Sequence, residues 1–280
     1  MILDTNIIKR YFTSFILGNL NASKYRNVRT YCMFIGYGRS GHSLIGALLD
    51  AHPNISIGME EDVLNLVKCH FSRKQIFYCI TRNARIFKKK HNNTWTGYSY
   101  KVQGQYQGTF TRLEIIGDKK GAASSMRLGD NFELYHKLEQ TVRCPVRIIH
   151  VIRNPFDNIS TMINRNLGYN KSPDRHQFLY YISKYFLRAG VNKELKMKSN
   201  LNILDIYHED FVANPRENLK KILDFLNITG DEKYYSSCEN IIYESPNKSK
   251  FSIKWPEYFI ELVHSEIQNY QFLRRYSYND

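Results

Sequence analysis

A short apolar run followed at once by a glycine-rich loop constrains the fold of this chain more than any other feature. Residues 31–35 read Tyr-Cys-Met-Phe-Ile, an uninterrupted apolar run typical of a strand buried on both faces. Residues 36–43 form the loop, and residues 44–51 place apolar side chains at helical spacing until His52 and Pro53 end the helix. A buried strand that turns directly into a helix is the first half of a βαβ unit and predicts a parallel sheet.

The rest of the chain continues this alternation of strands and helices. Apolar runs predict further strands at residues 113–116, 146–152 and 201–206. Amphipathic spacing predicts helices at residues 41–51, 60–71, 132–141, 156–166, 176–197, 215–226 and 256–270. Residues 72–112 read as irregular, basic and aromatic. We therefore expect one domain over residues 1–280, an α/β fold of three α/β/α layers with a mostly parallel central sheet.

The loop itself has the chemistry of an anion site. It reads Gly-Tyr-Gly-Arg-Ser-Gly-His-Ser and nearly satisfies the P-loop pattern GxxxxGK[ST], with Gly36, Gly41 and Ser43 in register. Glycines let backbone N–H groups point inward, and the helix N-terminus adds partial positive charge. His42 stands where a nucleoside triphosphatase has its lysine, although Arg39 lies within the loop. The alternative is a glycine-rich turn that binds no ligand.

The charge and the cysteine content further limit which partners and which cellular compartment we expect. Lys and Arg total 40 against 26 Asp and Glu, and the net charge of +14 favours a polyanionic partner: nucleic acid, acidic membrane, phosphorylated cofactor or acidic glycan. A basic surface that only aids solubility is the alternative. The five cysteines show no CxxC pair and no zinc spacing, which predicts free thiols in a reducing compartment and no metal. Residues 1–20 predict neither a leader peptide nor a transmembrane segment, so we expect a cytoplasmic protein.

Residues 34–44, together with Leu-Asp-Ala-His-Pro at 49–53, resemble the sulfotransferases that use 3′-phosphoadenosine-5′-phosphosulfate (PAPS). Loops of that family typically read P-[RK]-S-G-T-T-L, and L-D-A-H-P is common in the branch that contains the protein-tyrosine sulfotransferases. The resemblance implies a P-loop NTPase-like sulfotransferase fold, PAPS as donor, adenosine 3′,5′-bisphosphate (PAP) as product, and no metal. It assigns the 5′-phosphosulfate to Arg39, Ser40, Gly41, His42 and Ser43, where His42 replaces a threonine but still offers its backbone N–H.

A second motif follows the strand predicted at 146–152. An arginine at a strand end and a hydroxyl two helical turns later can converge on one phosphate. Residues 153–161 resemble the 3′-phosphate site of the same family, usually R-[DN]-P-x-[DE]-x-x-x-S, and Arg153 and Thr161 hold the matching positions. Ser160 comes one residue early and would point about 100° away on a helix, so Thr161 ranks first. The alternative is an ordinary helix N-terminus with Asp157 in its first turn.

The resemblance also implies the catalytic residues. A glutamate shortly after L-D-A-H-P is the base of the tyrosine-sulfotransferase branch, and Glu60 takes that position, with Glu61 and His42 as the other candidates. Both glutamates could instead only cap a helix. Lys119 resembles the lysine of the family's D-K-[ST]-P element, which approaches the transferring sulfonate, and it is preferred over Lys120 by register. An exposed turn lysine is the alternative.

The acceptor is expected to bind residues 72–112, which we interpret as an insertion. Its aromatic and basic residues suit an acidic glycan or peptide, and the hydroxyl of a carbohydrate is preferred over an amine, a tyrosine or a small phenol or alcohol. These residues are Lys88, Lys89, Lys90, Trp95, Tyr98, Tyr100 and Tyr106. A buried aromatic cluster beside a solvated basic loop explains the same composition. One residue among Lys248, Lys250, Lys254 and Trp255 is expected to touch the donor.

Two other classes of protein are also compatible with parts of the sequence. A P-loop kinase or NTPase would need the missing lysine and an acidic strand end for Mg²⁺, but the strand at 146–152 leads into Arg153. A nucleic-acid-binding protein is suggested by charge alone, because no helix carries an Arg/Lys stripe and no RNA-binding aromatic signature is present, so no specific nucleic acid is expected. The sequence leaves the oligomeric state open.

Overall fold

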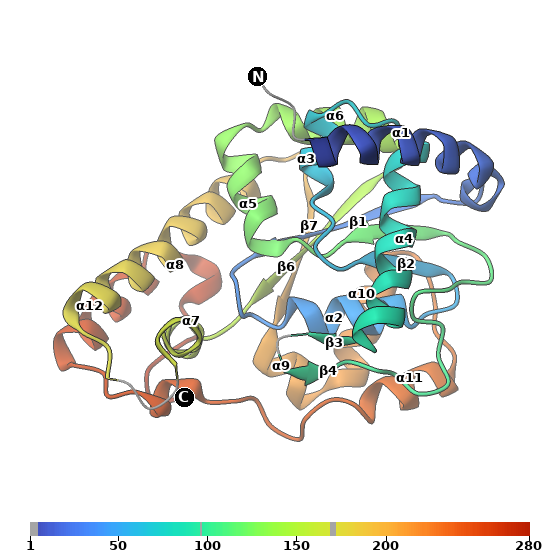
Figure 1. Cartoon of the computed structure of the whole chain (residues 1–280). Helices are drawn as coiled ribbons and strands as arrows, with labels where there is room; N and C mark the ends of the chain where they lie inside the picture. Colours follow the sequence, from blue (N-terminus) through green and yellow to red (C-terminus); the bar gives the residue numbers. More distant parts are fainter. Residues whose placement is uncertain (1–4, 96, 169–171) are drawn as a thin grey trace.

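A five-stranded sheet forms the centre of the molecule, in a computed structural model that describes residues 5–95, 97–168 and 172–280 (Figure 1). Its strands are all parallel, in the order β2-β5-β1-β6-β7. The strands are β1 (Thr30–Gly36), β2 (Ile55–Gly58), β5 (Ile115–Asp118), β6 (Val146–Ile152) and β7 (Asn202–Tyr207). The predicted parallel sheet is therefore confirmed, and all five strands end at the same edge of it.

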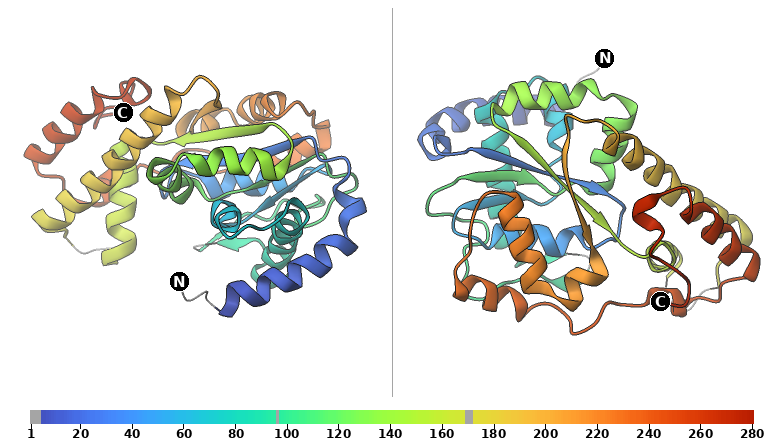
Figure 2. Two further views of the ribbon diagram at one scale, coloured as in Figure 1. Left: turned by 90° about the horizontal axis from the view of Figure 1, so that it is seen from above. Right: turned by 180° about the vertical axis from the view of Figure 1, so that it is seen from behind.

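Helices cover both faces of the sheet because the strands are apolar on both faces (Figure 2). In β1, Met33 and Ile35 face one apolar cluster, whereas Cys32 and Phe34 face the other. The first cluster includes α3 (Val63–Lys68), α4 (Arg73–His91), α5 (Gly121–Asp130) and α6 (Glu133–Val142), with α1 (Thr5–Leu20) packed on α4. The second includes α2 (His42–Asp50), α9 (His208–Ala213), α10 (Pro215–Phe225) and α11 (Glu232–Glu239). The three-layer α/β/α prediction is confirmed.

Three more helices extend the molecule beyond the end of β6. They are α7 (Pro155–Leu167), α8 (Arg175–Lys196) and α12 (Glu257–Ile267), which enclose a third cluster around Phe156, Phe178 and Trp255 (Figure 1). The remaining elements are small. A hairpin joins β3 (Thr94–Trp95) to β4 (Tyr98–Ser99), and short 3₁₀ turns span Ala22–Tyr25, Ser249–Ser252 and Gln271–Leu273.

The Leu-Asp-Ala-His-Pro segment connects the end of α2 to neighbouring segments by hydrogen bonds. The buried Asp50 carboxylate accepts hydrogen bonds from the backbone N–H groups of Ile57 (2.9 Å) and Gly108 (2.7 Å). His52 donates from Nε2 to the carbonyl of Thr229 over 3.0 Å. The polar residues of this segment therefore act in packing, and they set where β2 begins.

Two sequence predictions about elements were wrong. Residues 73–91 form the long helix α4 rather than an irregular segment, and its start carries a capping box in which Ser72 and Gln75 bond each other's backbone. The helix predicted at 60–71 begins only at Val63, because Glu60 and Asp62 both have a left-handed backbone (φ 63°). The short strand β2 and the helices α1 and α5 were not predicted. The strand predicted at 113–116 lies two residues later, so that Asp118 ends it.

Candidate active site

A cavity of 590 Å³ lies at the carboxyl ends of the strands, where parallel α/β sheets bind their ligands. Each strand delivers a residue to it: the glycine loop after β1, Glu60 after β2, Lys119 after β5, Arg153 after β6 and His208 after β7. Its cationic lining is Arg39, Lys119, Lys120, Arg153, Arg165 and Lys248, against Glu60 as the acidic lining residue. The cavity therefore suits an anionic ligand.

The glycine loop has the backbone that an anion site needs. Gly36 (φ 134°), Arg39 (φ 70°) and Gly41 (φ 94°) lie at positive φ, so the loop turns sharply between β1 and α2. A Cβ at Gly41 would lie 2.5 Å from Nδ1 of His208, so only glycine fits there. Arg39, Gly41, His42 and Ser43 line the cavity.

Two side chains of this loop point into the protein rather than into the cavity. Ser40 is fully buried, where its hydroxyl donates to the carbonyl of Tyr37 (3.1 Å) and accepts from Nδ2 of Asn158 (2.8 Å). His42 donates from Nε2 to the carbonyl of Ile35 over 3.0 Å. Burial lowers the pKa of His42 to about 4, so its ring is neutral and weakly basic. This geometry disfavours His42 as the base.

Arg153 ties three segments together at the wall of the cavity. It is 6% exposed and donates to the carbonyls of Arg39 (3.0 Å) and Asn247 (2.7 Å) and to the hydroxyls of Thr161 (3.2 Å) and Ser249 (3.2 Å). Burial lowers its pKa. Within the described residues no carboxylate lies within ion-pairing distance of its guanidinium. A buried cation held only by neutral oxygens is poised to bind an external anion.

The helix α7 decides between the two candidate hydroxyls. Thr161 lines the cavity beside Arg153. Ser160 is fully buried and accepts a hydrogen bond from Nε1 of Trp255 over 2.9 Å, so its hydroxyl faces the third apolar cluster instead. Ser160 therefore lies away from the cavity, whereas Thr161 lines it.

Among the C-terminal candidates, Lys248 lines the cavity. Lys250 is buried and donates from Nζ to the backbone oxygen of Asp280 over 2.7 Å, and Trp255 packs in the third apolar cluster. Lys254 is exposed and is absent from the lining.

Glu60 and Lys119 form an ion pair within the cavity. Nζ of Lys119 lies 3.0 Å from Oε1 of Glu60, and Nζ of Lys120 lies 3.5 Å from Oε2. Burial alone would raise the pKa of Glu60, but the two lysines outweigh it, so that this pKa lies below its ordinary value. Burial lowers the pKa of Lys119. Glu60 is therefore held ionised, as a proton acceptor must be.

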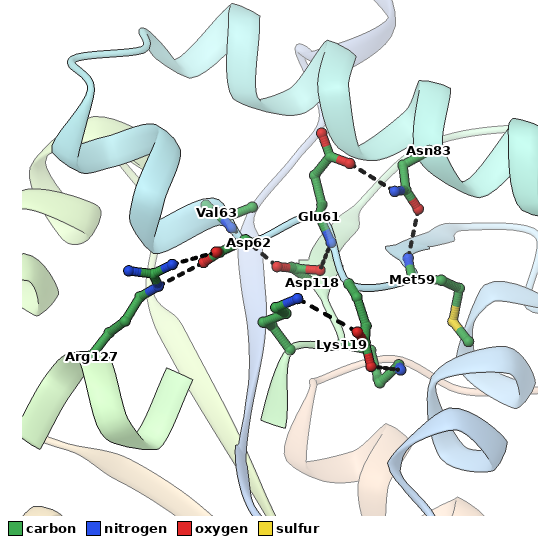
Figure 3. A network of polar contacts seen from close by, with 10 residues as sticks. Met59, Glu61, Asp62, Val63, Asn83, Asp118, Lys119 and Arg127 are labelled. Carbon is green, nitrogen blue, oxygen red and sulfur yellow. Dashed lines mark hydrogen bonds and ion pairs between the residues drawn. The ribbon is translucent and has the colours of Figure 1, made fainter. Parts of the chain in front are cut away.

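Glu61, the other glutamate, is turned away from the cavity. Its carboxylate pairs with Arg10. It also accepts a hydrogen bond from Nδ2 of Asn83 over 2.7 Å (Figure 3). Neither glutamate caps α3, because the residue that precedes this helix is Asp62.

Aromatic side chains form part of the cavity wall. Tyr98 and Tyr100, from the β4 hairpin and the residue after it, line the cavity together with Tyr243. The rings of Tyr98 and Tyr243 meet edge to face at 6.3 Å, and the guanidinium of Arg165 lies 5.8 Å from the centre of the Tyr98 ring. Of the other expected acceptor residues, Lys88, Lys89, Lys90 and Tyr106 lie outside the lining. The side chain of Trp95 lies outside the part of the chain that the structure describes.

Among the lining residues that sequence reasoning missed are His208, Arg165 and Tyr243. His208 directly follows β7, so the rule that ligands bind at strand ends could have found it. Burial lowers the pKa of His208 to about 3 and leaves it neutral against Gly41. No local pattern marks Arg165 or Tyr243. Among the described residues, no group of three or more His, Cys, Asp or Glu is arranged to hold a metal, and no helix is long and apolar enough to span a membrane.

A parallel sheet whose central strand runs into a glycine loop, beside a cation-lined cavity, defines a P-loop type of α/β protein without a P-loop lysine. The sulfotransferase family profile matches residues 33–232, and the chain belongs to this family.

Individual relatives are distant. Over 216 residues the chain is 22% identical to protein-tyrosine sulfotransferase A of Caenorhabditis elegans, an alignment that covers 75% of this chain and 53% of that protein. The chain therefore spans about half the length of this curated relative. Among solved structures, the sulfotransferase domain of the curacin biosynthetic pathway matches with a TM-score of 0.50 at 12% identity, over 88% of this chain and 99% of that one. The sulfotransferase domain of the Synechococcus PCC 7002 olefin synthase matches with a TM-score of 0.49 at 16% identity, over 86% of this chain and 95% of that one. The family match, with the likeness to the curacin-pathway domain, confirms the predicted sulfotransferase fold.

Proposed function

We propose that this protein transfers the sulfonate group of PAPS to a hydroxyl of an acceptor, with Glu60 as the base. The observation that carries the proposal is a single cavity in which the buried Arg153, which pairs with no carboxylate of the described residues, faces the same space as the Glu60–Lys119 pair. Family membership supports the reaction type. The finer assignments below rest on the arrangement of the residues.

The cavity fits the anionic groups of the donor. The backbone N–H groups of the loop from Gly38 to Ser43 and the side chain of Arg39 would hold the 5′-phosphosulfate. Arg153 and Thr161 would hold the 3′-phosphate, because the guanidinium forks and the hydroxyl beside it adds a further contact. Lys248 lies on the same wall and adds positive charge.

In the proposed reaction the acceptor oxygen attacks sulfur, and a new S–O bond forms as the bond from sulfur to the phosphate oxygen breaks. Glu60 takes the proton of the acceptor hydroxyl. Lys119 and Arg39 stabilise the negative charge that develops on the released phosphate oxygen, a contribution of several kcal/mol by analogy with oxyanion donors. No step requires a metal ion.

Replacing Glu60 tests the base. Glu60→Gln should lower turnover by about 100-fold or more, because general-base catalysis typically contributes that much. PAP affinity should stay within about twofold of the wild type, since Glu60 carries no positive charge toward the phosphates. Turnover with a phenolic or sugar acceptor and calorimetric PAP binding measure the two effects. Wild-type turnover in Glu60→Gln would reject this assignment. So would a loss of turnover in Glu61→Gln but not in Glu60→Gln.

The acceptor we propose is a carbohydrate, because the faces of Tyr98, Tyr100 and Tyr243 can stack on sugar rings and Arg165 can bind an acidic substituent. A tyrosine side chain is the second candidate, favoured by the likeness to a protein-tyrosine sulfotransferase. Mass spectrometry of a mixed library of glycans, tyrosine peptides and small phenols, incubated with PAPS, should show the added sulfonate on one class.

Calorimetry separates this proposal from a P-loop kinase or NTPase. PAP should bind tightly, whereas ATP with Mg²⁺ should bind weakly, because the loop lacks the lysine and β6 leads into Arg153 rather than an acidic residue. Preferential binding of ATP with Mg²⁺ would overturn the proposed donor.

A further inference from the structure

The loop that carries Glu60 has an unusual backbone. Glu60 and Asp62 both lie at φ 63°, in the left-handed region that side chains other than glycine rarely adopt. Such residues persist only where the surroundings hold them, and they gather at functional sites. The question is which contacts hold this loop.

A buried carboxylate organises the loop from beneath. Asp118, the last residue of β5, is 3% exposed, and its oxygens accept hydrogen bonds from the backbone N–H groups of Glu61 (2.8 Å) and Val63 (3.1 Å) (Figure 3). Alternating left-handed residues turn the N–H groups of a short segment to one side, which makes a concave anion site. Here the acceptor is the protein's own Asp118 carboxyl, whose pKa burial raises to about 7.

Two more contacts complete the support. Asn83 of α4 accepts from the backbone N–H of Met59 over 2.7 Å and donates to Glu61, so it anchors the start of the loop (Figure 3). Lys119, the residue after Asp118, holds the Glu60 side chain at 3.0 Å. The end of β5 therefore contacts both the backbone and the carboxylate of the proposed base.

We propose that Asp118 is a positioning residue, which acts by fixing the backbone on the C-terminal side of Glu60 so that its carboxylate faces the cavity beside Lys119. This inference rests on the proposed role of Glu60 as base.

The test compares two buried aspartates with the same chemistry. Asp118→Asn keeps the shape but turns one acceptor oxygen into a donor, so the N–H of Val63 or Glu61 loses its partner. We expect turnover to fall about 10-fold or more, with PAP affinity within about twofold of the wild type, as for the loss of an interaction made only in the transition state. Asp50→Asn is the matched control, because Asp50 is 4% exposed and also accepts two backbone N–H groups. Its turnover per folded molecule should stay at the wild-type level.

A double-mutant cycle separates positioning from general destabilisation. If Asp118 acts through Glu60, adding Asp118→Asn to Glu60→Gln should change the residual turnover less than about twofold. An equal fall of turnover in both backgrounds, or in Asp118→Asn and Asp50→Asn alike, would overturn the proposal. Wild-type turnover in Glu60→Gln would overturn the base assignment itself, and this inference with it, whatever Asp118→Asn does.

A separate observation concerns the outer face of α1. This helix packs on α4 through Tyr11, Ser14 and Gly18. Its opposite face, along the outside of the molecule (Figure 2, dark blue), exposes five large apolar side chains at helical spacing. They are Ile8 (40% exposed), Phe12 (63%), Phe15 (53%), Ile16 (59%) and Leu20 (74%).

The segment that carries this face has charged residues of one sign. Residues 5–29 hold five basic and no acidic residues. Arg10 and Arg29 pair with carboxylates of the body, whereas Lys9, Lys24 and Arg26 are exposed. Apolar side chains flanked by free cations are the pattern of a helix that lies in the surface of an anionic membrane. A two-fold contact through the same face would bring like charges together.

We infer that α1 docks this protein, with its helix axis in the membrane plane, on a membrane that carries anionic lipids. The inference is independent of the reaction catalysed. Phe12 and Phe15 would enter the boundary between headgroups and acyl chains, and the basic residues would contact the lipid phosphates.

Vesicle sedimentation tests the docking. The wild type should sediment with vesicles that contain phosphatidylserine and much less with phosphatidylcholine alone. Phe12→Ser/Phe15→Ser should bind about 10-fold more weakly, since two aromatic side chains are removed from the apolar phase. Tyr180→Ser/Leu187→Ser, which removes two equally exposed apolar side chains of α8 (56% and 59%), should bind as the wild type does. No binding to the anionic vesicles, or a dimer in light scattering that Phe12→Ser/Phe15→Ser dissociates, would overturn the inference.

Discussion

At the scale of single residues, two of the places where this chain departs from its family's motifs meet in space. His42 stands where the loop pattern has threonine, and Gly121 stands where the D-K-[ST]-P pattern has proline. A Cβ at Gly121 would lie 2.7 Å from Nε2 and 2.8 Å from two carbons of the His42 ring. The larger residue in one motif therefore occupies the space left by the smaller one in the other.

This contact predicts that the effect of Gly121→Ala changes sign with residue 42. Beside His42 the added methyl should destabilise the fold by about 1–2 kcal/mol, because overpacking costs more than alanine gains over glycine in a helix. Beside a threonine, in His42→Thr/Gly121→Ala, the same change should be neutral or stabilising. Urea unfolding of the four proteins measures the coupling, and additive free energies of unfolding would contradict it.

His42 also predicts how stability depends on pH. Its pKa is about 4 in the folded protein and about 6.5 when unfolded, so between these values the unfolded state binds a proton that the folded state does not. Its contribution to stability is therefore full above pH 6.5 and is lost as pH falls toward 4, by up to about 3 kcal/mol. In His42→Thr, the difference in unfolding free energy between pH 7 and pH 4.5 should shrink by about 2 kcal/mol. An unchanged difference in urea unfolding would show that another group carries the linkage.

At the scale of elements, α7 shows how one residue of helical register separates packing from ligand binding. Thr161 faces the cavity and Arg153, whereas Ser160 faces Trp255. Asn154 at the helix start accepts from the N–H of Phe156 (3.0 Å), and Pro155 opens the first turn. These start signals fix the register of the helix and hence which hydroxyl reaches the anion site.

The pair Thr161→Ala and Ser160→Ala should separate the two roles. Thr161→Ala should weaken PAP binding about 5- to 10-fold, the loss of one hydrogen bond to a charged group, and change stability little. Ser160→Ala should leave PAP affinity within about twofold but lower stability by about 1–3 kcal/mol, because Nε1 of Trp255 loses its buried partner. Calorimetry and thermal unfolding give both numbers. The opposite pattern would place the 3′-phosphate against Ser160.

The same elements show what could be read from the sequence and what could not. The strand at 146–152 and the loop after β1 were predictable because uninterrupted apolar runs and glycine spacing are local signals. The helix α4 was missed although Ser72 and Gln75 form a capping box, since its basic last turn resembles a solvated loop. The ion pair of Glu60 with Lys119 could not be predicted from the sequence, because it depends on β2 and β5 being neighbours in the sheet. Tyr243 and Arg165 reach the cavity from segments that carry no motif.

At the scale of the whole molecule, the fold concentrates charge where all five strands end. Six cations of the cavity face one carboxylate, so part of the net charge of +14 has a defined place. Like charges repel, most strongly away from water, and of these six cations Lys119 and Arg153 are buried. Arg153 in addition loses most of its hydration. The ligand-free protein therefore stores electrostatic repulsion that a bound polyanion would relieve.

This repulsion predicts a large stabilisation by PAP. At about 100 times its dissociation constant, PAP should raise the free energy of unfolding by about 2.7 kcal/mol, which appears as a rise of several degrees in the melting temperature. Arg153→Ala should lose most of this response at the same concentration, because it removes the buried cation that we propose binds the 3′-phosphate. Arg216→Ala is the matched control, since Arg216 pairs with Glu232 and Glu239 outside the cavity and its loss should leave the PAP response intact.

Raising the salt concentration toward ~1 M should shrink the wild-type response, since screening weakens the attraction between the exposed cavity cations and the phosphates. A full PAP response in Arg153→Ala would mean that the phosphates bind elsewhere on the basic surface.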